Sequence, residues 1–111
     1  MSYIIQILGP AKRSLRKFQK HEQSVARELI EPLKNDPRPS GCDNVMGHKN
    51  ILRVKHQDIR VIYGVADDIR HVFIIDVRRR NEATYKNIPI QTLDLAISEA
   101  ISTLKARSRD D

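Results

Sequence analysis

Three closely spaced apolar segments in the middle of the chain constrain its fold most. Residues Ile51 to Lys55 alternate between apolar and basic side chains, which is the period of a strand with one covered face. Two further segments rich in β-branched residues follow, at Ile59 to Val65 and at Arg70 to Val77. The turns between them, Gln57–Asp58 and Ala66–Asp68, are very short. Connections this short join antiparallel neighbours, so the sequence predicts an antiparallel meander.

The rest of the chain predicts one more strand and three helices. In the three helical segments apolar residues recur at spacings of three and four. Pro32 should end the second of these helices between Ile30 and Lys34. The expected elements are a strand at Tyr3–Leu8, a very basic helix at Ala11–Lys20, a helix from Glu22, a loop at Asn35–Gly47 and an amphipathic helix at about 91–108. The order β-α-α-β-β-β predicts an α+β fold, a small antiparallel sheet with two N-terminal helices on one face and an extra C-terminal helix.

Length and composition favour a single basic domain that binds an anion. The 111 residues are enough for one core, so we expect one domain over 1–111, with its main body at about 3–87. The formal net charge is +6. Only 5% of residues are aromatic and none is Trp, which disfavours a nucleic-acid reader built from stacking rings. An anionic partner would therefore be held by charge and hydrogen bonds.

The sequence gives no sign of a membrane span, a secretion signal, a cofactor or a metal site. No run approaches the roughly 18 apolar residues of a membrane span, and Met1 to Leu8 carries no basic leader, so the cytoplasm is the expected compartment. The single cysteine, Cys42, excludes an internal disulfide and a multi-cysteine zinc cluster. The histidines also lack metal-ligand spacing; they are His21, His48, His56 and His71.

Cations inside the predicted strands are the most informative feature for function. Arg53, Lys55 and Arg60 interrupt apolar runs, and Arg78 to Arg80 follow at a strand end. In an antiparallel hairpin the first three can approach one another on one face, where their mutual repulsion would be relieved by a phosphate. A solvated sheet face without a ligand is an equally good explanation of the same pattern.

These segments together resemble the RelE/ParE superfamily of toxin–antitoxin toxins. The residues that carry the resemblance are Pro37-Arg38-Pro39-Ser40-Gly41, Gly47, Leu52-Arg53-Val54-Lys55, Asp58-Ile59-Arg60-Val61-Ile62-Tyr63 and Val77-Arg78-Arg79-Arg80 with Tyr85. The resemblance extends from Tyr3 to about Tyr85. It implies a compact sheet with a basic concave face and neutralisation by a cognate antitoxin. RelE-like members cut messenger RNA on the ribosome, whereas ParE-like members inhibit DNA gyrase and lack the nuclease residues.

The resemblance implies candidate catalytic residues. The sequence is more similar to the RelE-like nucleases than to the ParE-like members. The matched positions are Arg53, Lys55, Arg60, either Arg79 or Arg80, and Tyr85. Arg53 stands where the pattern has a lysine, which keeps the charge but is a poorer proton acceptor. Either Arg79 or Arg80 would neutralise the leaving oxygen, and Tyr85 would stack on or orient a splayed base.

The implied chemistry is attack by an RNA 2′-hydroxyl on its own 3′-phosphate, without a metal ion. Lys55 is the candidate base, because neighbouring cations favour its neutral form. Arg53 and Arg60 would stabilise the extra negative charge on the pentacoordinate phosphorus. Because the reaction needs a 2′-hydroxyl, the substrate would be RNA.

The leading hypothesis is a RelE-like toxin, a metal-independent endoribonuclease that acts on mRNA and inhibits translation. Its expected partners are a cognate antitoxin, mRNA and the ribosome with its 16S rRNA, and operator DNA that a toxin–antitoxin hetero-oligomer would bind through the antitoxin. Two alternatives stay open, a ParE-like non-nucleolytic inhibitor of gyrase and a non-catalytic RNA- or ribosome-binding module. The apolar stripe of the C-terminal helix would pack on the protein's own sheet or helices, or contact a second copy or the antitoxin.

Overall fold

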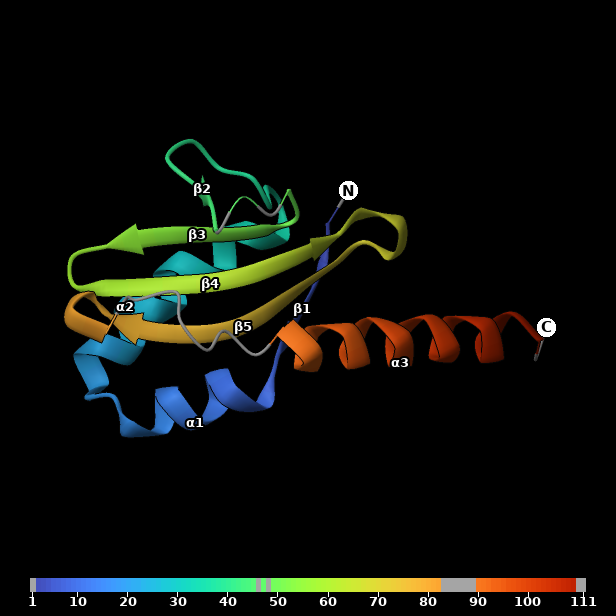
Figure 1. The fold of residues 1–111 in the computed structure, drawn as a ribbon, viewed down its shortest axis with the longest axis horizontal. Helices are drawn as coiled ribbons and strands as arrows, with labels where there is room; N and C mark the ends of the chain where they lie inside the picture. Colours follow the sequence, from blue (N-terminus) through green and yellow to red (C-terminus); the bar gives the residue numbers. More distant parts are fainter. Residues whose placement is uncertain (1, 46, 48, 83–89, 110–111) are drawn as a thin grey trace.

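The computed structural model describes residues 2–45, 47, 49–82 and 90–109 (Figure 1). The elements in chain order are β1 (Ile4–Ile7), α1 (Gly9–Lys17), α2 (Lys20–Ile30), the 3₁₀ helix η1 (Glu31–Lys34), β2 (Asp43–Asn44), β3 (Ile51–His56), β4 (Ile59–Ala66), the 3₁₀ helix η2 (Asp67–Ile69), β5 (His71–Arg79), the 3₁₀ helix η3 (Arg80–Glu82) and α3 (Ile90–Arg109). The predicted α+β class and the order of its main elements are confirmed.

The sheet has the strand order β1-β5-β4-β3-β2. Strands β3, β4 and β5 form the predicted antiparallel meander. The sheet as a whole is mixed rather than antiparallel, because β1 pairs with β5 in parallel, with Ile4 opposite His71. The helices α1 and α2 lie between β1 and the rest of the sheet in the sequence, and they supply the long connection that a parallel pair needs. Asp43–Asn44, expected within a loop, pairs with β3 as a two-residue edge strand.

The helix boundaries follow local signals that shift them from the predicted ranges. Helix α1 starts at Gly9, and Pro10 fits its first turn because the N–H that proline lacks has no partner there. Helix α2 starts at Lys20, where Gln19 and Glu22 form a capping box. Beyond Ile30 the chain continues as η1, which contains Pro32, in agreement with the predicted end of the helix.

The two faces of the sheet bury different side chains. One face, which includes Val61, Tyr63 and Ile74, packs against α2 and against the buried residues of α1. The other face, which includes Ile62 and Phe73, lies under α3. Figure 1 shows α3 beginning beside β1 and extending past the end of the sheet. No helix in the described ranges is both long and apolar enough to cross a membrane.

Helix α3 packs on the sheet through its first half. Leu93 and Ala96 are 6% and 5% exposed, which confirms that part of the apolar stripe packs on the protein's own sheet. Leu93 lies directly over Gly64 of β4, and a Cβ at position 64 would be 2.9 Å from Leu93 Cδ2. Further along, Leu95, Ile101 and Leu104 are exposed.

Candidate functional site

The register of the meander brings three cations into one row across β3, β4 and β5. Lys55 lies opposite Arg60, and Arg60 lies opposite Arg78. Residues directly opposite one another in an antiparallel pair project from the same face, on strands about 4.8 Å apart. Arg53, two residues before Lys55 on β3, shares that face. We refer to Arg53, Lys55, Arg60 and Arg78 as the cation face.

A tight hairpin positions the row at one end of the sheet. Gln57 and Asp58 connect β3 to β4, and Gln57 adopts a φ of +53°, a conformation that is uncommon for residues other than glycine. The guanidinium of Arg60 turns back toward this hairpin. Its Nη1 donates hydrogen bonds to the carbonyl oxygens of Gln57 at 2.8 Å and Ile59 at 3.1 Å. Backbone dipoles therefore hold Arg60 in place.

Two carboxylates share the face with the four cations. Arg53 Nη2 donates to Asp43 Oδ2 at 2.6 Å, and Arg78 Nε donates to Asp76 Oδ2 at 3.0 Å. The hydrogen bond from Arg53 lowers the pKa of Asp43 below its usual range, and the nearby charge of Lys55 acts in the same direction. No carboxylate whose side chain the structure describes forms an ion pair with Lys55 or Arg60. Among the side chains that the structure describes, the face thus carries two more cations than carboxylates, an arrangement suited to a phosphate.

A β-bulge in β5 decides which arginine joins the cation face. Tyr63 pairs with Ile74 while Ile62 pairs with Asp76, so Ile75 is an extra residue in β5. Regular alternation from Phe73 through Ile75 would have placed Arg79 on the cation face. Because of the extra residue, Asp76 and Arg78 project there instead.

Arg79 therefore does not join the cation face, which leaves Arg80 as the remaining candidate of the two arginines expected near it. Arg79 pairs with Ile59 and points toward the helices. Its Nε donates to Glu22 Oε2 at 2.8 Å, and its Cζ lies 4.6 Å from the centroid of the Phe18 ring. Arg79 tethers the sheet to the end of α1 and the start of α2.

Arg80 lies next to the cation face through its backbone. It belongs to η3, is exposed, and its N–H donates to the carbonyl oxygen of Asp58 at 2.7 Å. This hydrogen bond places the backbone of Arg80 beside the β3–β4 turn. Tyr85, the predicted stacking residue, lies outside the described residues. Within those residues there is no group of three or more His, Cys, Asp or Glu side chains that could hold a metal ion.

Arg78 is the residue of this face that the sequence reasoning missed as a candidate. Positions 72 to 75 are all apolar and buried, so they carry no alternation from which the bulge could be recognised. The one local signal is Asp76, a carboxylate directly after this apolar run. An acidic residue there indicates that the strand face has changed character, but it does not say at which residue.

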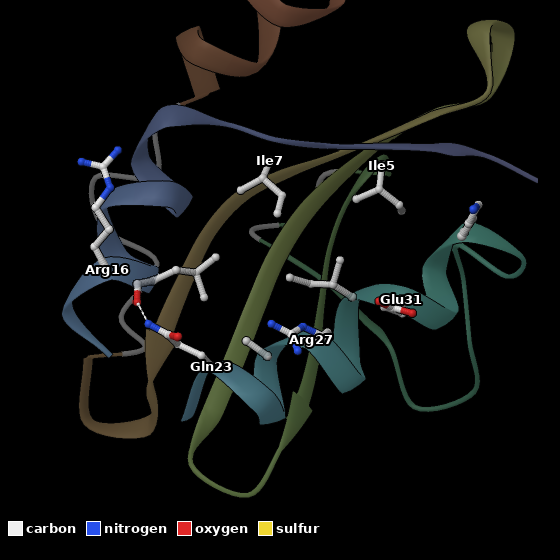
Figure 2. Close-up of a pocket in the computed structure, with 10 residues that line it drawn as sticks. Ile5, Ile7, Arg16, Gln23, Arg27 and Glu31 are labelled. Atoms are coloured by element: carbon white, nitrogen blue, oxygen red, sulfur yellow. Dashed lines mark hydrogen bonds between the residues drawn. The ribbon is translucent and has the colours of Figure 1, made fainter. Parts of the chain in front are cut away.

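A groove of about 550 Å³ lies on the opposite face, between β1, α1, α2 and η1 (Figure 2). Its apolar lining consists of Ile5, Ile7, Leu15, Ala26 and Ile30. Arg16, Arg27 and Lys34 add three positive charges and Glu31 one negative charge. Gln23 Nε2 donates to the carbonyl oxygens of Leu15 at 2.7 Å and Phe18 at 3.2 Å, which fixes the junction of the two helices.

No protein-family model and no curated protein matches this sequence. Solved structures do match the fold. A chain of the archaeal RelE–RelB complex from Pyrococcus horikoshii OT3 aligns with a TM-score of 0.64 and 23% identity, over 75% of this chain and 100% of that chain. A mutant of the Escherichia coli toxin RelE in its free state gives a TM-score of 0.67 and 19% identity, over 85% and 97% of the two chains. The isolated E. coli RelE toxin gives 0.64 and 19%, over 93% and 99%.

The chain therefore has a RelE-like fold. This confirms the resemblance found in the sequence at the level of the fold. At identities of 19–23% the likeness is one of fold, and function depends on the residues that the fold brings together.

Proposed function

We propose that this protein is the toxin of a type II toxin–antitoxin system, and that it cleaves mRNA as a metal-independent endoribonuclease. The observation that carries the proposal is the row of Lys55, Arg60 and Arg78 on one face of the sheet. A phosphodiester anion would compensate the excess positive charge of this face, and the protein's own cations would supply the stabilisation of the transition state. The similarity of the fold to RelE toxins supports the same function.

The reaction is a transesterification within the RNA. Lys55 acts as the general base and takes the proton of the 2′-hydroxyl, and the 2′-oxygen forms a bond to the adjacent phosphorus. The bond from phosphorus to the 5′-oxygen breaks, and that oxygen takes a proton from solvent. The products are a 2′,3′-cyclic phosphate and a 5′-hydroxyl.

The arginines of the cation face stabilise the charge that builds up in this reaction. Arg53, two residues before Lys55 on β3, and Arg60, held by two backbone carbonyls opposite Lys55 on β4, contact the phosphoryl oxygens. Arg78, opposite Arg60 in the same row, also contacts the phosphoryl oxygens. Arg80, beside the hairpin, neutralises the leaving oxygen, and Tyr85 orients a base.

The cognate antitoxin occupies the groove between β1 and the helices. An apolar floor with three cations and one carboxylate around it suits an acidic amphipathic segment. The ribosome, through its 16S rRNA, presents the mRNA to the opposite face. Binding of operator DNA belongs to the antitoxin in the assembled complex.

The nuclease assignment is tested by expression without antitoxin. Wild type should arrest growth and leave mRNA fragments with 5′-hydroxyl ends, while Lys55→Ala should do neither. Lys20→Ala, which removes an equally exposed lysine from the start of α2, is the matched control and should behave as wild type. Growth arrest with intact mRNA, or undiminished toxicity of Lys55→Ala, would refute the assignment. Inhibition of gyrase supercoiling by the purified protein would favour the ParE-like alternative.

The antitoxin site is tested separately by Arg27→Glu, a charge reversal at an exposed position of the groove. Co-expressed antitoxin should rescue growth from wild type but not from this variant, which should stay fully toxic. Equal rescue of both would place the antitoxin elsewhere.

A further inference from the structure

Asp76 connects the bulge of β5, helix α1 and the cation face. Its Oδ1 accepts a hydrogen bond from Ser14 Oγ at 2.7 Å and another from the Val77 backbone N–H at 2.8 Å. Its Oδ2 accepts from Arg78 Nε at 3.0 Å. One carboxylate thus fixes the backbone after the extra residue, the side chain of Arg78 and the flank of α1.

These groups are largely withdrawn from solvent. The side chains of Asp76 and Arg78 are 14% and 11% exposed. Ser14 lies half-buried on α1, one turn from Ala11 and from Phe18, which are buried in the core. The carboxylate therefore has a fixed position, since its partners come from two packed elements. A charge-assisted hydrogen bond to Nε also sets the plane of the guanidinium.

We propose that Asp76 is a positioning residue that orients Arg78 toward the substrate phosphate, and that Ser14 holds Asp76 in place. The proposal rests on the proposed function for its catalytic part. The hydrogen bond from Arg78 Nε to Asp76 holds this guanidinium in the row against repulsion by Arg60 directly opposite. A small displacement of a group that stabilises charge has a large effect on rate.

The charge of Asp76 and its hydrogen bonds predict opposite effects when the residue is changed. Removing a negative charge from a cationic face strengthens anion binding by electrostatics alone. Losing the hydrogen bond to Nε shifts the guanidinium of Arg78 from its position and slows the reaction. Asp76→Asn separates the two, because its amide oxygen can still accept from Ser14 and Val77 while its NH₂ group opposes the Arg78 N–H.

The experiment measures single-turnover cleavage of mRNA on programmed ribosomes by wild type, Asp76→Asn, Ser14→Ala and Ser14→Thr. In Asp76→Asn the maximal rate should fall about 10- to 100-fold while the half-saturating toxin concentration stays equal or decreases. Ser14→Ala should lower the rate about twofold to tenfold, as expected for one lost hydrogen bond, and Ser14→Thr should keep the wild-type rate. Glu22→Gln breaks an ion pair of Arg79 on the other face and should leave the rate per folded molecule unchanged.

A second readout does not depend on cleavage. The Nε–H signal of Arg78 in ¹⁵N NMR should shift on titration with inorganic phosphate in wild type, and this N–H should exchange with water faster in Asp76→Asn. An increase in the cleavage rate of Asp76→Asn, or an unchanged rate and unchanged exchange, would overturn the positioning role. If wild type cleaves no RNA but the NMR signals behave as described, the nuclease proposal fails and the role of Asp76 stands.

Discussion

The contact between Gly64 and Leu93 gives a quantitative prediction about how α3 is held on the sheet. A methyl group added at position 64 would be 2.9 Å from Leu93 Cδ2 and 3.0 Å from Cδ1, closer than carbon atoms pack. Overpacking of this kind costs about 1–3 kcal/mol. Alanine loses less backbone entropy than glycine when it is fixed in a strand, which offsets about 0.5–1 kcal/mol of this cost. Gly64→Ala should therefore lower the free energy of unfolding by up to about 2.5 kcal/mol.

The destabilisation by Gly64→Ala should depend on the side chain of Leu93. Leu93→Ala alone should destabilise the protein by about 2–4 kcal/mol, because it removes a buried side chain that is 6% exposed. In that background the methyl group has room, so Gly64→Ala should become neutral or stabilising by about 0.5 kcal/mol. The expected coupling energy is about 1–3 kcal/mol.

Urea unfolding of the four proteins in this double-mutant cycle measures the coupling directly. Leu95→Ala provides a matched control, because Leu95 lies on the same helix but is 65% exposed. Its effect should add to that of Gly64→Ala without coupling. Additive effects of Gly64→Ala and Leu93→Ala would refute the inference that Leu93 packs over Gly64 in solution.

Three further predictions concern stability and RNA binding. The hydrogen bond from Arg79 lowers the pKa of Glu22 to about 2. The stability that this pair contributes is therefore complete above about pH 4.5 and is lost as the pH falls toward 2. Acid unfolding of Glu22→Gln should lack that pH dependence. Tyr63 donates to the Pro37 carbonyl oxygen at 2.7 Å from a fully buried position, so Tyr63→Phe should lower the free energy of unfolding by about 1–2 kcal/mol in urea melts, and an unchanged value would contradict this. Lys55→Ala should reduce the slope of log affinity for RNA against log salt concentration by about one, and an unchanged slope would remove Lys55 from the phosphate contacts.

The sequence was sufficient for the meander and for the placement of Arg53, Lys55 and Arg60 on one face. Short turns and the alternation from Leu52 to Lys55 determine both, since each depends only on residues close together in the chain. The parallel pairing of β1 with β5 joins residues such as Ile4 and His71 that are far apart in sequence, and no local pattern encodes it. The pairing of Asp43 with Arg53 is equally invisible, because β2 has only two residues.

The choice between the arginines at the end of β5 shows why the site needed the structure. Val72 to Ile75 are buried on both faces of the sheet, so the pattern of side chains carries no information on the bulge. The bulge shifts the alternation by one residue and exchanges Arg79 for Arg78 on the cation face. A basic cluster in a sequence can thus indicate the presence of an anion site without showing which of its members contribute.

A comparison of Arg78→Ala with Arg79→Ala in mRNA cleavage on ribosomes tests the central claim most directly. The cleavage rate is expressed per folded molecule, with the folded fraction taken from urea melts of each variant. The cation face predicts that Arg78→Ala loses about 100-fold or more in rate, whereas Arg79→Ala loses stability but keeps the wild-type rate. Loss of cleavage in Arg79→Ala together with wild-type cleavage by Arg78→Ala would contradict the assignment of the site.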